Sequence, residues 1–179
     1  MGSLLLLVTL AASPGTAQAQ AKFAGRVQGG YGFGDGYGGT VGGSVGVEFP
    51  LLFGQPAFVG PWAMYNSGGT FLRDGLLWDQ ESTFLGIEGG GMFLEKPFMI
   101  RGSGNIGAAF ITTRIPGEEE ISETRLDLSG GVAFGYQLGN WYVAAEPYTF
   151  LIVGSDNMGG SFNLFLTVGF RPEVKKKEE

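Results

Sequence analysis

The chain has 179 residues, enough for one domain with a sizeable core. Its formal net charge of -6 at pH 7 argues against nucleic acid as a partner. The chain contains no cysteine and no histidine. This excludes disulfides, thiolate metal sites, cysteine nucleophiles and histidine-dependent triads, and we expect no cofactor and no catalytic residue.

The first 21 residues have the anatomy of a secretory signal peptide. Leu4 to Ala12 is an apolar run, too short to cross a bilayer as a helix, which takes about 20 residues. Small residues follow, and Ala17-Gln18-Ala19 and Ala19-Gln20-Ala21 are candidate cleavage sites. No Lys or Arg precedes the run, and a buried amino-terminal helix is the alternative. We predict three parts: a signal peptide at 1–21, a β-domain at 22–170 and a charged tail at 171–179.

Apolar residues recur with a period of two along most of the chain, which is typical of strands with one apolar face. The 34 glycines are interleaved with Phe, Val, Leu and Ile, which argues against disorder. Pro61 weakens the third predicted strand, and we expect Pro147 to force a bulge in the seventh. The eight predicted strands are Lys22–Phe33, Thr40–Phe49, Ala57–Tyr65, Thr83–Phe93, Phe98–Thr113, Thr124–Leu138, Trp141–Val153 and Phe162–Phe170.

The predicted connections alternate in length. Leu94 to Pro97 and Gly139-Asn140 are short, whereas Asn66 to Ser82 and Arg114 to Glu123 are long and polar. Outer-membrane barrels have short periplasmic turns and longer outer loops, and an even strand number places both termini on one side. The pattern predicts an all-β fold: an eight-stranded antiparallel up-and-down transmembrane β-barrel.

Aromatic residues lie at or near every strand end on the side of the short turns. Membrane interfaces favour aromatic side chains, and outer-membrane barrels carry aromatic girdles. A coincidence in a Phe-rich chain is the alternative. The predicted periplasmic-side girdle consists of Phe23, Phe49, Phe58, Phe93, Phe98, Tyr136, Trp141 and Phe170.

Charged residues of both signs fall on the opposite, inward face of the predicted strands. An eight-stranded barrel is just wide enough for side chains to fill, and an unpaired buried charge is costly. We therefore expect Arg–carboxylate pairs that plug the lumen, with a gated or narrow conductance as the alternative. The predicted charge network consists of Arg26, Glu48, Glu88, Arg101, Arg125, Asp127 and Glu146.

Glycines and aromatic residues share that inward face. Small lumen residues could leave a cavity for an apolar ligand, or the aromatic rings could fill the core. The inward glycines are Gly30, Gly32, Gly42, Gly46, Gly86 and Gly90. The candidate lining residues are Phe84, Met92, Tyr142, Tyr148 and Phe165.

The chain resembles the small eight-stranded outer-membrane proteins of Gram-negative bacteria, the OmpA-barrel, OmpX and OmpW group, from Lys22 to Phe170. The sharpest feature is Phe162 to Phe170, FNLFLTVGF, which is similar to the carboxy-terminal strand signal of that family. The resemblance implies recognition of this strand by the barrel-assembly machinery. In that family the aromatic is usually the last residue, whereas here Arg171 to Glu179 follow Phe170. The resemblance also implies an outer-membrane location with both termini in the periplasm and lipid against the apolar face.

Three functions are consistent with these patterns. The first is a structural or surface-interaction barrel whose long loops, including the acidic residues Glu118, Glu119, Glu120 and Glu123, meet an extracellular or envelope partner. The second is a narrow channel or binder for small apolar solutes, which the OmpW resemblance implies. The third is a secreted soluble carrier like a lipocalin, with its apolar face turned inward.

Overall fold

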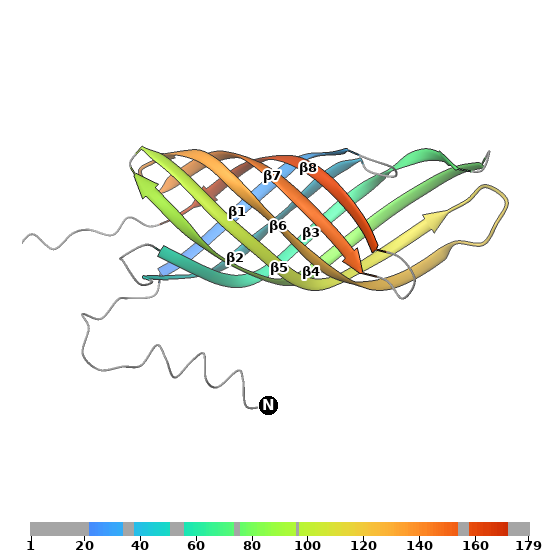
Figure 1. The fold of residues 1–179 in the computed structure, drawn as a ribbon, viewed down its shortest axis with the longest axis horizontal. Helices are drawn as coiled ribbons and strands as arrows, with labels where there is room; N and C mark the ends of the chain where they lie inside the picture. The colour runs from blue at the N-terminus through green and yellow to red at the C-terminus, as the bar shows by residue number, and fades with distance from the viewer. Residues whose placement is uncertain are drawn as a thin grey trace, which may run out of the picture.

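A computed structural model of the chain describes residues 22–33, 38–50, 56–73, 76–95, 97–153 and 158–171. These residues form one closed antiparallel barrel in which each strand pairs with its neighbours in sequence and β8 pairs with β1 (Figure 1). The prediction of an eight-stranded up-and-down barrel is confirmed. None of the described residues forms a helix long and apolar enough to cross a membrane. The strands are β1 (Lys22–Phe33), β2 (Gly39–Pro50), β3 (Pro56–Arg73), β4 (Leu76–Glu95), β5 (Phe98–Arg114), β6 (Ile121–Leu138), β7 (Trp141–Val153) and β8 (Met158–Phe170).

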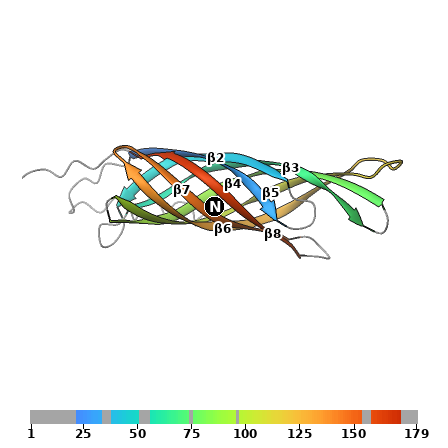
Figure 2. The same cartoon turned by 90° about the horizontal axis from the view of Figure 1, so that it is seen from above.

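The barrel has two different ends. The start of β1 and the end of β8 lie together, because Gly25 pairs with Phe170. We call this the terminal end. At the opposite end, β3, β4, β5 and β6 stand out beyond the other four strands (Figures 1 and 2). We call this the projecting end.

The projection follows from strand length. Strands β3 to β6 have 18, 20, 17 and 18 residues, whereas the other four have only 12 or 13. Pairing within the four long strands continues to Arg73 with Leu76, Asp79 with Arg114 and Thr113 with Ile121. We call the parts beyond the barrel the extension; they are Ser67–Arg73, Leu76–Glu81, Ile111–Arg114 and Ile121–Arg125.

The predicted loop from Asn66 to Ser82 is therefore wrong, because β3 and β4 continue through most of it. The pairing of β3 with β4 shifts register between Asn66 and Gly69 and then continues from Gly69 with Gln80 to Arg73 with Leu76. Gly68 has a φ of 71°, which is favourable for glycine, and its N–H donates to the Asn66 side chain at 2.7 Å. The predicted loop from Arg114 to Glu123 is shorter than expected, since β6 already begins at Ile121.

The two prolines inside strands interrupt pairing without shifting it. Around Pro61, pairing of β2 with β3 stops after Ser44 with Trp62 and resumes at Val47 with Val59 in the same register. Around Pro147, pairing of β6 with β7 resumes in the same register too. Proline lacks the N–H that the ladder needs but tolerates an extended backbone. The expected bulge at Pro147 is therefore absent from the described strand.

The apolar face of the strands points outward. In β8, Leu164 and Leu166 are 48% and 62% exposed, whereas Asn163 and Thr167 are fully buried. The exception predicted in this strand, Phe165, is 1% exposed and points into the lumen. A soluble carrier would have the reverse arrangement, so the outer face does not support the lipocalin-like alternative.

The structure places seven of the eight predicted girdle residues on the outer face at the terminal end. Phe23, Phe98 and Trp141 are more than half exposed, and Trp141 meets Phe170 edge to face at 5.2 Å between ring centroids. Phe58 is the exception, because it pairs with the inward-facing Glu48 and directly opposite residues share a face. The remaining outward residues of the predicted girdle are Phe49, Phe93 and Tyr136.

A second outward aromatic belt lies toward the projecting end and was not predicted. Its members are Tyr31, Phe33, Tyr65, Phe110 and Phe162. Phe23 and Phe33 mark the two belts on one strand, ten residues apart. At about 3.3 Å per residue and a tilt of about 40°, the belts are about 25 Å apart, which matches the apolar band of outer-membrane barrels.

Inward aromatic rings lie over inward glycines on the next strand. Directly paired residues of this kind are Gly30 with Phe165, Phe58 with Gly90, Gly131 with Tyr148 and Tyr142 with Gly169. A Cβ at Gly131 would lie 2.6 Å from Cδ2 of Tyr148, and one at Gly30 would lie 2.7 Å from Cδ1 of Phe165. The carbonyl oxygens of Leu164 and Pro147 would lie 2.0 and 2.6 Å from the Cβ positions at Gly30 and Gly131, so these glycines make room for the neighbouring backbone as well as for the rings.

We predict that Gly169→Ala destabilises the refolded barrel by about 1–3 kcal/mol, the usual result of overpacking. A Cβ at Gly169 would collide with Cζ, Cε1 and Oη of Tyr142, so the ring must leave its place. Urea unfolding in detergent, followed by tryptophan fluorescence, measures this difference.

Gly102→Ala is the matched control. Gly102 also lies within a strand, but a Cβ there would meet nothing within 4 Å. This variant should be as stable as the wild type or more stable by up to about 1 kcal/mol, because alanine has less conformational entropy to lose. Equal destabilisation of the two variants would show that the ring contact is not what selects glycine at position 169.

Candidate functional site

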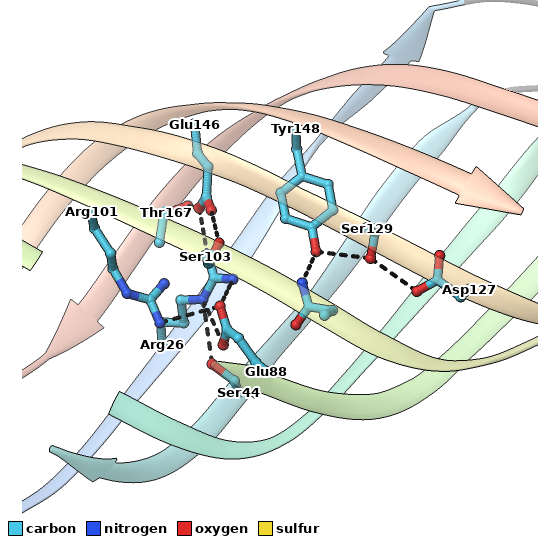
Figure 3. A network of polar contacts seen from close by, with 11 residues as sticks. Arg26, Ser44, Glu88, Arg101, Ser103, Asp127, Ser129, Glu146, Tyr148 and Thr167 are labelled. Atoms are coloured by element: carbon cyan, nitrogen blue, oxygen red, sulfur yellow. Dashed lines mark hydrogen bonds and ion pairs between the residues drawn. The ribbon is translucent and has the colours of Figure 1, made fainter. Parts of the chain in front are cut away.

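A charge network crosses the lumen in the half nearer the terminal end (Figure 3). Arg26 on β1 is 4% exposed and forms ion pairs with Glu88 on β4 and Glu146 on β7, both fully buried. Arg101 on β5 pairs with Glu88 at 3.2 Å. Two guanidinium groups thus balance two carboxylates, and four strands are joined through the centre of the barrel.

Hydroxyl groups form further hydrogen bonds with the charged groups of this network. Thr167 Oγ1 donates to Glu146 Oε2 at 2.9 Å, and Ser103 Oγ donates to Glu146 Oε1 at 3.3 Å. Arg26 Nε also donates to Ser44 Oγ at 3.3 Å. Buried ions are tolerated only when such partners replace the water that they lose, so these small polar residues are part of the site.

A second ion pair lies nearer the terminal end of the barrel. Arg171 Nε donates to Glu48 Oε2 at 2.7 Å, and the backbone N–H of Arg171 donates to the carbonyl of Asn140 at 2.7 Å. Arg171 is 6% exposed. The predicted charged tail at 171–179 includes Arg171, because the local pattern does not distinguish it from the residues that follow.

Arg101 of the charge network also contacts Phe58, the residue that pairs with Glu48 of the second ion pair. The Arg101 guanidinium carbon lies 3.7 Å from the centroid of the Phe58 ring, a cation–π contact. The neighbouring cavity measures about 20 Å³, which is room for about one water molecule. Its lining includes Arg26, Glu48, Phe58, Glu88, Arg101 and Tyr142. Nη1 of Arg101 is buried and has no hydrogen-bond partner among the described residues.

The half nearer the projecting end is filled by aromatic rings. Phe84 and Phe150 lie 4.6 Å apart between centroids, Tyr148 lies 5.0 Å from Phe150, and Phe165 lies 5.4 Å from Tyr148. Trp62 closes the group at 6.2 Å from Phe84. These rings come from β3, β4, β7 and β8, so the cluster spans the lumen.

The predicted apolar lining residues fall into two groups. Phe84, Tyr148 and Phe165 belong to the aromatic cluster, whereas Met92 and Tyr142 pack with Met99, Ala133 and Ala144 in a separate cluster. Trp62 and Phe150 were missed. Phe150 lies on the same face as Tyr142 and Tyr148 by the period of two, and that signal could have identified it.

Arg125 and Asp127 do not join the network. Arg125 pairs with Glu123 at 2.6 Å near the projecting end, where both side chains are about one-third exposed. Asp127 is fully buried, accepts a hydrogen bond from Ser129 at 2.9 Å and has no arginine partner among the described residues. Ser129 contacts the Tyr148 hydroxyl at 3.2 Å, which in turn bonds Asn105. Of the predicted charge network, the described structure thus joins Arg26, Glu88, Arg101 and Glu146, and it leaves Arg125 and Asp127 outside this group.

Glu88 and Glu146, both predicted members of the charge network, meet around Arg26. The same guanidinium group holds both carboxylates, which balances their charge within the lumen.

Several solved structures have the same fold. Neisserial surface protein A matches with a TM-score of 0.62 at 12% sequence identity, covering 85% of this chain and 99% of that chain. The N-terminal β-barrel domain of Pseudomonas aeruginosa OprF matches with a TM-score of 0.53 at 15% identity, covering 84% and 98%. Ail, the attachment invasion locus protein of Yersinia pestis, matches with a TM-score of 0.50 at 13% identity, covering 86% and 99%.

The chain thus has the fold of the small eight-stranded outer-membrane barrels, which confirms the structural resemblance noted in the sequence. No protein-family model and no curated protein sequence matches the chain.

We predict that Arg26→Met destabilises the barrel by about 3–5 kcal/mol, because it leaves a buried carboxylate without its counter-ion. Arg101 still neutralises Glu88 in this variant, so Glu146 carries the excess charge. Denaturant unfolding of the refolded protein in detergent micelles gives the free energy difference.

The double variant Arg26→Met with Glu146→Gln tests the charge balance. It restores neutrality, so it should regain at least about half of the lost stability. If the double variant is less stable than Arg26→Met, the network does not act through charge balance.

Proposed function

We propose that the protein is a bacterial outer-membrane β-barrel with a closed lumen and that it acts as a surface-interaction protein through its extension. The barrel carries an outward apolar band between two aromatic belts, which fits a lipid environment. The short-turn, terminal end lies in the periplasm in this proposal, with both termini, and the extension lies outside.

The proposal rests on two features together: the lumen is filled with side chains, and the extension stands beyond the barrel. The aromatic cluster and the charge network occupy successive parts of the lumen. The extension adds paired strands well beyond the barrel. A pore needs a continuous passage, which the filled lumen does not offer, whereas a binding protein needs a surface that stands clear of the membrane, which the extension offers.

Ion pairs and hydrogen bonds link charged side chains of the extension and of the turn after β5 among the described residues. Arg114 bridges Glu81 at 2.6 Å and Glu120 at 2.8 Å, which ties β4, β5 and the turn after β5 together. Tyr65 on β3 donates to Glu81 at 3.0 Å. Fixed side chains of this kind prepare a surface for binding without a large ordering cost.

A catalytic role is not part of the proposal, because the chain has neither histidine nor cysteine. Strand β8 alternates apolar and polar residues up to Phe170, which suits recognition by the barrel-assembly machinery. The names of two proteins that share the fold refer to a surface location and to attachment, and they are consistent with this role.

The second candidate function, a narrow channel or binder for small apolar solutes, needs space that the rings occupy. Phe84, Tyr148 and Phe165 contact other rings of the aromatic cluster and do not line an open passage. The surface-interaction role is therefore the better supported of the two.

We predict that the refolded wild-type protein gives no steady conductance steps across a planar lipid bilayer in concentrated KCl. Both the aromatic cluster and the ion-paired layer must open before hydrated ions pass. Steady steps at low voltage would contradict the closed lumen and would favour the channel.

We predict that an epitope inserted at Gly117 is labelled by antibody on intact cells. Gly117 lies in the exposed turn of the extension and has a positive φ, so an insertion there leaves the strands intact.

The matched control carries the same epitope at Gly139, in the short turn at the other end of the barrel, which also has a positive φ. This variant should be labelled only after the outer membrane is permeabilised. The reverse pattern would overturn the proposed orientation and, with it, the surface role of the extension.

A further inference from the structure

Three charged side chains follow one another on the inward face of β6, where the barrel meets the extension. They are Glu123, Arg125 and Asp127, and they alternate with the exposed residues Thr124 and Leu126. Arg125 Nη2 pairs with Glu123 Oε2 at 2.6 Å. Two carboxyl groups thus lie beside one guanidinium group on this strand, and the guanidinium group lies with the carboxylate nearer the projecting end.

The carboxyl group of Asp127 is buried and only partly bonded. Its Oδ2 accepts a hydrogen bond from Ser129, whereas its Oδ1 has no partner. The residues directly opposite on β5 and β7 are Gly107 and Ile152, whose side chains offer no donor. From the other described strands no charged side chain interacts with Asp127, and the titratable group that faces it is the Tyr148 hydroxyl, which contacts the same Ser129.

Arg125 can reach Asp127 as well as Glu123. Side chains two residues apart on a strand share a face, and their Cα atoms lie about 6.6–6.8 Å apart. Arg125 already spans this separation to Glu123. Asp127 lies at the same separation in the other direction, and its free Oδ1 can accept a hydrogen bond from a guanidinium group. Rotation about the side-chain bonds of Arg125 therefore exchanges one carboxylate for the other.

The ion pair with Glu123 holds Arg125 only weakly. Both side chains are about one-third exposed, and exposed ion pairs contribute little to stability. A buried carboxylate is different, because it is costly without a counter-ion. Asp127 is therefore compatible with its surroundings either as the neutral acid or with a cation beside it. The protonation state of Asp127 thus decides which of the two carboxyl groups needs Arg125.

We propose that Arg125 is a two-position latch, which pairs with Glu123 while Asp127 is protonated and with Asp127 once that carboxyl group loses its proton. In the second position Glu123 is left as a free carboxylate of the extension. A proton bound inside the lumen thus changes the charge that the extension presents. This pH-dependent device goes beyond the proposed function, and it operates on whichever side of the membrane the extension lies.

The test follows Arg125 itself in the full mature chain, refolded in uncharged detergent. Isotope-labelled arginine gives one Nε signal per arginine side chain in the NMR spectrum, and Arg125→Lys identifies the signal of Arg125. We expect this signal to move between about pH 5 and about pH 8, the range in which a buried carboxyl group exchanges its proton. A signal that keeps its position over this range overturns the inference.

Glu123→Gln shows where Arg125 lies at each pH. At the lower pH the signal of Arg125 should differ between the wild type and this variant, because only the wild type has the ion pair with Glu123. At the higher pH the two signals should nearly coincide, because Arg125 then pairs with Asp127 in both proteins. Signals that differ as much at the higher pH as at the lower one show that Arg125 stays with Glu123, and they overturn the latch.

Asp127→Asn is the matched control for the proton. Asparagine has nearly the same shape and carries no charge at any pH, so Arg125 should remain with Glu123 and its signal should not move. Equal movement in this variant and in the wild type would assign the change to another titrating group and would end the inference.

Faster migration of the unheated sample than of the boiled sample on a gel verifies that each variant forms a barrel. Asp127 is fully buried, whereas Glu123 is partly exposed. The comparison with Glu123→Gln therefore decides the question even where Asp127→Asn fails to fold.

Discussion

The narrow lumen of an eight-stranded barrel constrains every inward side chain. Once β8 pairs with β1, the interior is just wide enough for side chains to fill, and each inward group must find partners across the barrel. Arg26 meets this constraint by holding carboxylates from β4 and β7 at the same time. The hydrogen-bonded wall closes the barrel, and such cross-lumen contacts give it a filled and specific interior.

The same constraint explains the abundance of glycine. An aromatic ring that points inward needs room on the neighbouring strand, and Tyr142 finds it over Gly169. Tyr148 does the same over Gly131. A chain rich in both glycine and phenylalanine can therefore fill a narrow lumen densely while keeping aliphatic side chains for the outer face.

The filled barrel and the extension have different roles in the proposed function. In the proposed function the barrel, with its outward apolar band, is the membrane anchor, and the extension is the part that meets a partner. The long strands β3 to β6 are continuous with the barrel wall, so the hydrogen-bonded pairing of the wall continues into the extension.

The alternation of residues along the chain determined much of the fold. Each predicted strand overlaps one that is present, and the faces of β8 follow directly from FNLFLTVGF, because a period of two separates outward from inward residues. Inward charges such as Arg26, Glu88 and Glu146 could be identified in the same way. Sequence reasoning failed where a residue's role depends on a neighbour far along the chain.

Only the tertiary structure decided those roles. Phe58 faces inward because the register places it opposite Glu48. Arg171 belongs to the barrel and not to the tail, because its side chain pairs with Glu48 and its N–H donates to the Asn140 carbonyl. Asp127 has no arginine partner among the described residues, and Arg125 lies nearer the projecting end, where it pairs with Glu123. Local pattern sets the face on which a side chain lies, but barrel closure and register determine which side chains meet, and these depend on all eight strands together.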